Sequence, residues 1–204
     1  MFTTVIFDRS GTLQNNINAF KEVIDKIFMH FGKKPISLDT IKETFILPYM
    51  SRRNIYIPEM SKEVQDKMFK DHMLEKWCSA CVFPWVYETL HTLHQQGIQL
   101  FVLSSDSYET LLPEIEKAWL TWVFTEVYGC AHEKDIILTE IITHYHLDPE
   151  TTLLVWDTSG EVFAGRKNGV KTAGISRWFQ TKKRLEEAKP DYLINTIEEI
   201  LSIV

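Results

Sequence analysis

Short apolar runs that each end at a small or acidic polar residue limit the folds open to this chain. Three such runs and the residues that follow them are 3–7 with Asp8, Gln99–Leu103 with Ser104, and Thr152–Trp156 with Asp157. Near-continuous apolar strands are typical of a parallel sheet that helices cover on both faces. Helical patterns lie between the runs, so the sequence predicts an α/β fold with a doubly wound parallel sheet.

Weaker patterns predict the remaining elements of this sheet. Further strands are expected at 122–124, 171–175 and 192–194. Helical periodicity predicts helices over 87–96, 136–144, 161–168 and 196–203. We expect the last of these helices to begin after Asn195 as its N-cap, with Glu198 as the acid in its first turn.

The segment between the first two strands is far longer than the dozen or so residues that a crossover needs. Two amphipathic helices are expected there, at 17–31 and 62–77, and Pro35, Pro48 and Pro58 interrupt what lies between them. The sequence therefore predicts a small, mostly helical cap domain, 15–81, inserted after the first strand. The α/β core domain would consist of 1–14 and 82–204.

Composition indicates a folded globular chain of 204 residues, with 45% apolar and 25% charged residues. The formal charge of -6 supplies no basic surface for nucleic acid or anionic lipid, and no apolar stretch approaches the ~20 residues of a membrane span. An odd number of cysteines, three, fits a reducing compartment. We expect a cytoplasmic protein without a nucleic-acid or membrane partner, and the sequence leaves its oligomeric state open.

The polar residues that end the three apolar runs are expected to meet. In an open α/β sheet the ligand crevice lies outside the carboxyl ends of the strands, which is where Asp8, Ser104 and Asp157 would be placed. Gly11 permits a sharp turn that presents backbone N–H groups beside Asp8. Two carboxylates at such a point repel each other unless a cation lies between them, and oxygen ligands suit Mg²⁺. The sequence therefore implies a magnesium site.

Four motifs, in this order, resemble those of the haloacid dehalogenase superfamily. They are 8–13 (Asp-Arg-Ser-Gly-Thr-Leu), Leu103-Ser104, Lys134, and 156–161 (Trp-Asp-Thr-Ser-Gly-Glu). The resemblance covers essentially the whole chain, including the long insert at the position of the family's helical cap. It implies a phosphatase-like hydrolase that uses Mg²⁺ and acts on a small phosphorylated metabolite.

The resemblance also implies a role for each matching residue. Asp8 would be the nucleophile that attacks phosphorus and forms an aspartyl-phosphate. Ser104 would donate a hydrogen bond to a phosphoryl oxygen, and Lys134 would neutralise charge on the nucleophile and the transferring group. Such a site works by positioning and electrostatic stabilisation.

Mg²⁺ would be held by Asp8, Asp157 and the backbone carbonyl of Ser10, and Glu161 stands where the family often has a further acid. Substrate contacts are expected from residues beside the motifs and from two cap arginines, whose guanidinium groups match anionic oxygens. These are Gly11, Thr12, Ser105, Arg52 and Arg53.

Three departures from the family pattern bear on turnover. Ser10 stands two residues after the nucleophile, where phosphatases of the family usually have a general acid, so we expect slow turnover unless Asp106 or a cap residue substitutes. Trp156 replaces a usual glycine, and Glu161 replaces aspartate. P-type ATPases, phosphonatases and dehalogenases also lack the acid. A catalytically impaired phosphate-binding or regulatory protein, and a hydrolase of C–P or C–halogen bonds, therefore stay open as alternatives.

A second motif, Trp-Cys-x-x-Cys, ends at Cys81 and includes Cys78. It resembles the redox motif of thioredoxin-like proteins but lacks the preceding strand. The spacing alone would also allow a zinc site with Cys130 and His132. Buried, unreactive thiols are the simpler interpretation.

Overall fold

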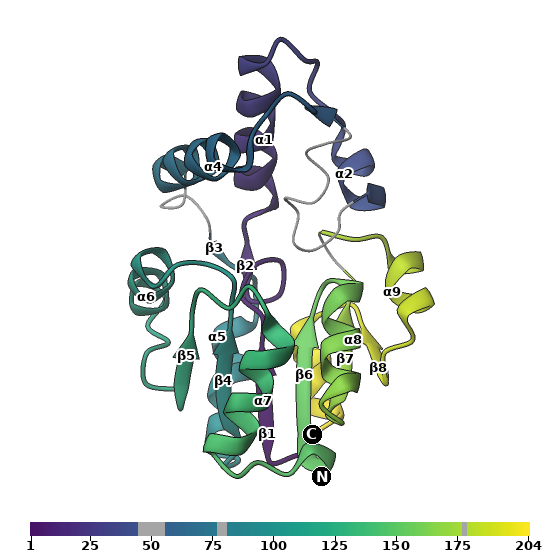
Figure 1. Ribbon diagram of the computed structural model, residues 1–204. Coiled ribbons are helices and arrows are strands. Elements are labelled where there is room, and N and C mark those ends of the chain that lie inside the picture. The colour runs from purple at the N-terminus through teal and green to yellow at the C-terminus, as the bar shows by residue number, and fades with distance from the viewer. Residues whose placement is uncertain (45–55, 77–80, 177–178) are drawn as a thin grey trace.

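The computed structural model describes residues 1–44, 56–76, 81–176 and 179–204 (Figure 1). Within these ranges the core is a six-stranded sheet with the strand order β5-β4-β1-β6-β7-β8, in which all neighbouring strands run parallel. The strands are β1 (Thr4–Phe7), β4 (Gln99–Leu103), β5 (Glu126–Tyr128), β6 (Thr152–Trp156), β7 (Lys171–Ile175) and β8 (Tyr192–Ile194). The predicted doubly wound α/β fold is confirmed.

Strand β1 lies between β4 and β6 in the middle of the sheet, and its side chains are buried on both faces. Its register pairs Phe7 with Val102 of β4 on one side and with Val155 of β6 on the other. The three strands therefore end at the same edge of the sheet. The residues that directly follow these strands, Asp8, Ser104 and Asp157, lie at this carboxyl edge.

Helices cover both faces of the sheet (Figure 1). On one face, Val5 and Phe7 pack in a core cluster with α5 and the closing 3₁₀ helix, and on the other face Ile6 packs in a cluster with α7. Successive residues of a strand point to opposite faces, which explains this division. The helices are α5 (Val86–Gln95), α6 (Tyr108–Lys117), α7 (Lys134–His144), α8 (Ser159–Lys167) and α9 (Lys182–Ala188), with 3₁₀ helices η3 (Pro149–Thr151) and η4 (Ile197–Ser202).

A separate group of helices lies beyond the carboxyl ends of the strands (Figure 1). It contains α1 (Ile17–His30), α2 (Leu38–Thr44) and α4 (Lys62–Lys76). Val23 and Ile27 of α1 form a small apolar cluster of their own with Ile57 and Met60. A two-stranded antiparallel ribbon, β2 (Gln14–Asn15) with β3 (Cys81–Val82), joins this group to the sheet. The helices expected at 17–31 and 62–77 are thus present in the described residues, and the division into 15–81 and the remainder stays a proposal.

The strand expected at 122–124 is wrong, because strand β5 begins only at Glu126, four residues after the expected start. Residues 121–123 form a turn, and Glu126 is the first residue paired with β4. Trp122 is half exposed and packs its ring between His91 and His94 of α5. The aromatic run that suggested a strand therefore contacts a helix instead.

The closing helix also differs from its expected form. It is the 3₁₀ helix η4, and Thr196 rather than Asn195 caps it. The side chain of Glu199, not of Glu198, completes a capping box with Thr196. The sequence therefore predicts the N-cap of this helix one residue too early.

Within the described ranges, no helix is long and apolar enough to cross a membrane.

Candidate active site

Asp8 is held at the carboxyl edge of β1 by a tight turn. The residue is 5% exposed, and its N–H donates to the carbonyl oxygen of Val155 at 2.9 Å. The chain reverses directly afterwards, because the N–H groups of Leu13 and Gln14 both donate to the carbonyl of Arg9 at 2.9 Å. Gly11 has a φ of 78°, which favours glycine. The turn therefore fixes the Asp8 carboxylate at the end of the central strand.

Lys134, the first residue of α7, places its ammonium group against Asp8. Its Nζ atom donates to Oδ1 of Asp8 at 2.7 Å and to Oε1 of Glu161 at 2.9 Å, and the side chain is buried. Burial alone would lower the pKa of Lys134, but Asp8 and Glu161 outweigh it and hold that pKa above its ordinary value. The lysine is therefore a fixed positive charge in the site.

The same lysine lies over the indole ring of Trp156, with Nζ 4.8 Å from the ring centroid. Trp156 is 1% exposed and packs in the core cluster between the sheet and α7. The tryptophan that replaces a usual glycine thus packs against Lys134, where its ring face attracts the ammonium group.

Asp157 follows β6 and faces Asp8 in the same buried region. Its Oδ2 atom accepts a hydrogen bond from the N–H of Phe179 at 3.0 Å. Its Oδ1 atom is buried and has no hydrogen-bond partner among the residues that the structure describes. Burial, and then the charges of Asp8 and Glu161, raise the pKa of Asp157 well above its ordinary value. An unsatisfied buried carboxylate beside two others marks a place that lacks positive charge.

Asp8 has a similar electrostatic environment. Burial raises the pKa of Asp8 to about 6, Lys134 opposes this shift, and Glu161 and Asp106 add to it. One lysine therefore does not compensate the carboxylates that surround it.

The donor set fits a hard divalent cation. Asp8 and Asp157 offer carboxylate oxygens, and the backbone carbonyl of Ser10 is the third expected donor. A Cβ atom at Gly11 would lie 2.6 Å from Cγ of Asp157, so only glycine leaves this space open. In the described part of the chain, no group of three or more His, Cys, Asp and Glu side chains could hold a metal ion. The metal site would accordingly rest on two carboxylates, the carbonyl and solvent.

Glu161, expected among the metal ligands, has both carboxylate oxygens engaged elsewhere. Oε1 accepts from Lys134, and Oε2 accepts from the hydroxyl of Thr158. The structure thus places Glu161 as the second partner of Lys134.

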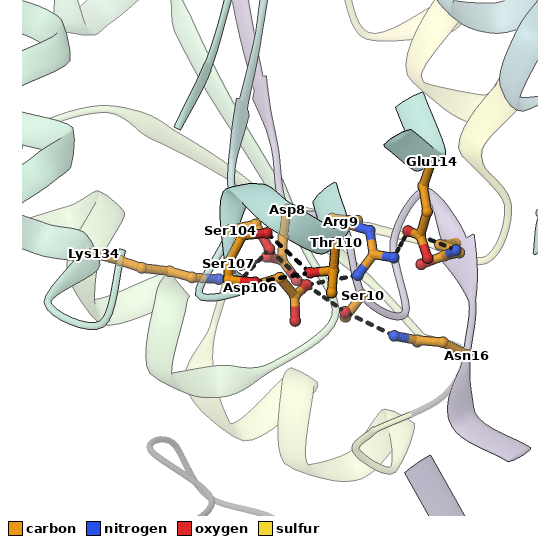
Figure 2. A network of polar contacts seen from close by, with 11 residues as sticks. Asp8, Arg9, Ser10, Asn16, Ser104, Asp106, Ser107, Thr110, Glu114 and Lys134 are labelled. Carbon is orange, nitrogen blue, oxygen red and sulfur yellow. Dashed lines mark hydrogen bonds and ion pairs between the residues drawn. The ribbon is translucent and has the colours of Figure 1, made fainter. Parts of the chain in front are cut away.

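Ser104 and Ser10 direct their hydroxyl groups at a carboxylate of the protein, that of Asp106 (Figure 2). The Oγ atoms of Ser104 and Ser10 lie 2.8 and 3.1 Å from Oδ2 of Asp106. Asn16 donates to Oγ of Ser10 at 2.8 Å. Burial opposes ionisation of Asp106, yet Arg9 and the hydrogen bonds hold the pKa of this carboxyl below its ordinary value. Asp106 therefore stays an anion and is a poor substitute for the missing general acid.

Arg9 links the network around Asp106 to helix α6. Its guanidinium group is 2.7 Å from Oδ2 of Asp106 and also forms an ion pair with Glu114 of α6. Gln14 donates to the same Glu114 carboxylate at 3.0 Å. Arg9 is 3% exposed, and two partly buried carboxylates provide the partners that a buried arginine requires.

Two further residues expected to bind substrate, Ser105 and Thr12, lie beside the motifs. The hydroxyl of Ser105 donates to the carbonyl of Ala131 at 3.1 Å. Thr12 is fully buried, and its Oγ1 atom lacks a hydrogen-bond partner within the described ranges. The Ser105 hydroxyl is thus engaged within the protein, and the roles of Ser105 and Thr12 in substrate binding stay predictions.

Some predictions fall on residues that are not described. Arg52, Arg53 and Cys78 lie outside the described residues, and for Cys81 only the backbone, in β3, is described. Cys130 is an exposed free thiol. The proposed arginine contacts and the redox and zinc interpretations therefore stay untested predictions.

The arrangement at the sheet edge agrees with a comparison of the chain with known protein families. The family model described as haloacid dehalogenase-like hydrolase matches residues 5–175, from β1 through β7. This chain belongs to the haloacid dehalogenase-like hydrolases. The matched range contains Asp8, Ser104, Lys134 and Asp157, and their roles stay predictions.

Relatives of this haloacid dehalogenase-like hydrolase match over nearly all of its length. A pyrophosphatase PpaX of Oceanobacillus iheyensis is 23% identical over 98% of this chain and 96% of its own. A phosphoglycolate phosphatase of Pseudomonas fluorescens is 22% identical over 97% of this chain and 78% of its own. A haloacid dehalogenase-like family hydrolase of Streptococcus pneumoniae has a TM-score of 0.86 at 20% identity, covering 99% of this chain and 98% of that structure. The last likeness extends the shared fold through the helices beyond the sheet.

Several residues of the hydrolase's polar network were not predicted from its sequence. Arg9 of the turn contacts Asp106 and Glu114 of α6, and Asn16, the N-cap residue of α1, donates to Ser10 (Figure 2). An arginine directly after the nucleophile, in a turn expected to be buried, is the one signal that could have indicated them, because a buried guanidinium needs carboxylate partners. Glu114 is 105 residues further along the chain, and only the fold brings it to Arg9.

Proposed function

We propose that this hydrolase is a Mg²⁺-dependent phosphatase that acts on a small phosphorylated substrate through an aspartyl-phosphate. The observation that carries the proposal is the placement of Lys134 between Asp8 and Glu161, together with a buried Oδ1 atom of Asp157 that has no hydrogen-bond partner among the described residues. A nucleophilic carboxylate, a fixed ammonium group and an unsatisfied metal-type oxygen are the parts that phosphoryl transfer requires.

The reaction would divide into two displacements at phosphorus. In the first, a carboxylate oxygen of Asp8 bonds to phosphorus while the bond to the leaving oxygen breaks. In the second, water attacks the aspartyl-phosphate, which releases orthophosphate and restores Asp8. Lys134 keeps its proton throughout, neutralises the nucleophile, and offsets charge on the phosphoryl oxygens. Asp8, Asp157 and the carbonyl of Ser10 would hold Mg²⁺. The bound ion would supply further positive charge that offsets the charge on the phosphoryl oxygens.

The proposed enzyme would turn over slowly, because Ser10 stands where a general acid is needed. Its hydroxyl cannot protonate a leaving oxygen or activate water as a carboxylic acid does, and Asp106 is held as an anion. General acid–base assistance typically contributes about 10²–10⁴-fold to a rate, so its loss would be large.

The helices beyond the sheet would close over the site and exclude water. Phe20 of α1 makes an edge contact with Phe179, with 5.2 Å between the ring centroids, and this contact supports docking of the helices over the sheet edge.

The substrate class is proposed from the relatives. One relative is named a pyrophosphatase and another a phosphoglycolate phosphatase, so pyrophosphate and phosphoglycolate are the first compounds to try. A phosphonate and a haloacid belong in the same panel, because enzymes of the superfamily without the general acid cleave C–P or C–halogen bonds.

The test is product release by purified protein with Mg²⁺ over this panel, measured as orthophosphate for the phosphorus compounds and as halide for the haloacid. Asp8→Asn removes the nucleophile, and Asp71→Asn makes the same chemical change on an exposed residue of α4 whose carboxylate pairs with Lys67. Release by the unaltered chain and Asp71→Asn, but not by Asp8→Asn, is the expected result. Absence of Asp8-dependent release from every compound would contradict the proposal.

Ser10 is also the observation that favours the second candidate, a phosphate-binding or regulatory protein that has lost turnover. Such a protein would bind orthophosphate with Mg²⁺ and release none from any substrate. Binding without Asp8-dependent hydrolysis would therefore decide for this second function.

A further inference from the structure

One oxygen atom of Asp106 collects the hydrogen-bond donors of the phosphate pocket. Oδ2 of Asp106 lies 2.8 Å from Oγ of Ser104, 3.1 Å from Oγ of Ser10 and 2.7 Å from the guanidinium of Arg9. Ser104 is fully buried, and the Asp106 side chain that accepts its hydrogen bond is 22% exposed. The arrangement is drawn in Figure 2.

A hydroxyl group has one hydrogen to donate. While Ser104 donates to Asp106, the same hydrogen is not available to a phosphoryl oxygen, and Ser10 is limited in the same way. The Arg9 charge is shared between Asp106 and Glu114, which satisfies it within the protein. The donors that an incoming phosphate would use on this side of Asp8 are thus engaged by an internal carboxylate.

The carboxylate is also a full negative charge close to the nucleophile. Arg9 and three hydrogen bonds hold the pKa of Asp106 below its ordinary value despite burial, and the charge of Asp106 in turn raises the pKa of Asp8. Two anions that need the same donors exclude one another, because each must be desolvated and neither can share a single hydroxyl hydrogen.

We propose that Asp106 competes with the phosphoryl group for Ser104 and Ser10, and that its return to these hydroxyls promotes release of orthophosphate after hydrolysis. Asp106 would thus weaken the binding of the orthophosphate product. The inference rests on the proposed phosphatase function, since it concerns the same pocket, and it adds a role for a residue outside the four motifs.

Binding of orthophosphate tests this directly. Titration calorimetry with orthophosphate and MgCl₂ would compare the unaltered chain with Asp106→Asn, which keeps the side-chain shape and removes the charge. Removing the carboxylate that competes for the Ser104 and Ser10 hydroxyls, and that directly repels the phosphate bound to them, should lower Kd about tenfold or more. Product inhibition during hydrolysis should strengthen by the same factor. An unchanged or higher Kd in a folded Asp106→Asn would overturn the proposal.

Glu114→Gln is the matched control. It removes the other carboxylate that pairs with Arg9, but Glu114 is bonded to Gln14 and Arg9 and to neither serine in the contacts described here. Competition for the hydroxyls predicts a Kd close to that of the unaltered chain. Equal tightening in both variants would show a general charge effect and contradict competition.

A second measurement needs no variant and so does not depend on folding. In a crystal structure of the unaltered chain with orthophosphate and Mg²⁺, Oγ of Ser104 should donate to the phosphate and lie out of hydrogen-bond range of Asp106. Phosphate bound with the 2.8 Å contact between Ser104 and Asp106 intact would overturn the proposal. Either result leaves the Asp8→Asn test of hydrolysis untouched, so the failure of this inference can be told apart from failure of the proposed function.

Discussion

The Nζ atom of Lys134 lies 2.7 Å from Oδ1 of Asp8, although the two residues are 126 positions apart in the chain. Asp8 directly follows the central strand and Lys134 begins α7, so the contact exists only because the strand end and the helix start meet at one edge of the sheet. The pair is buried, with side-chain exposures of 8% for the lysine and 7% for the aspartate. Low exposure makes this interaction stronger than a surface ion pair.

Replacing the lysine tests how much the site depends on this charge. Lys134→Met should lower kcat by about 10²–10³-fold, because a preorganised charge that faces the transferring group is lost. Lys167→Met is the control, since Lys167 is exposed and pairs with Asp135 on the surface. Steady-state rates with Mg²⁺ measure both. A Lys134→Met enzyme with kcat close to that of Lys167→Met would remove Lys134 from the catalytic machinery.

Trp156 should position Lys134 through its ring face. Trp156→Phe and Trp156→Leu both leave a smaller side chain in the core, but only phenylalanine keeps an aromatic face under the ammonium group. A partly desolvated contact of this kind contributes about 1 kcal/mol, so kcat of the leucine variant should be several-fold below that of the phenylalanine variant. Equal kcat values in two folded variants would mean that the indole serves packing alone.

The sequence predicted the parts of this molecule that local patterns determine. The apolar runs located β1, β4 and β6 to within a residue, because strands buried on both faces leave an unmistakable pattern. Asp8 and Ser104 could be predicted for the related reason that they directly follow these strands, whereas Lys134 was indicated by the resemblance to the family's motifs.

What could not be predicted depends on contacts between distant segments. Strand β5 is short, with Glu126 exposed at one end, so its place is set by pairing with β4 and not by composition. The Arg9–Glu114 pair joins a turn to a helix that the sequence did not predict, and no local pattern encodes it. Glu161 was expected to bind metal, whereas its contact with Lys134 depends on how α7 and α8 pack.

Gly11 should be irreplaceable in a way that another glycine of similar conformation is not. Gly11 and Gly32 both have positive φ, 78° and 66°, so alanine is strained at either position. At Gly11 the added Cβ would also meet the Asp157 carboxylate and the Phe179 ring, whereas at Gly32 nothing lies within 4 Å. Gly11→Ala should therefore lower kcat about 10²-fold or more by displacing Asp157, and Gly32→Ala should change only stability. Comparable rates in the two variants would contradict this placement of Asp157.

The site should cost the metal-free protein stability at neutral pH. The pKa of Asp8 is raised from 3.8 to about 6, so between these values the folded chain binds a proton that the unfolded chain has lost. The free energy of unfolding therefore falls as the pH rises through this window and stays lower above it, by roughly 3 kcal/mol in total. Asn cannot ionise, so Asp8→Asn in EDTA should gain stability over the unaltered chain as the pH rises from 4 to 6.

Urea unfolding at several pH values between 4 and 7.5 measures this difference. Asp71→Asn should show no comparable dependence, because Asp71 is half exposed and pairs with Lys67 on the surface of α4. An Asp8→Asn variant that is less stable than the unaltered chain at pH 7.5 would contradict the predicted sign.

Restoring an acid at position 10 should speed turnover most when Asp106 is neutralised as well. Oγ of Ser10 is only 3.1 Å from Oδ2 of Asp106, so in Ser10→Asp alone two carboxylates would crowd together and repel. The double variant Ser10→Asp/Asp106→Asn removes that repulsion. Its first turnover, measured before orthophosphate accumulates, should be about tenfold or more faster than that of the unaltered chain, since general acid–base assistance contributes 10²–10⁴-fold in favourable geometry. The control is Ser10→Asn/Asp106→Asn, which has the same shape and no acid, and equal first-turnover rates in the two double variants would refute a missing proton donor as the cause of slow turnover.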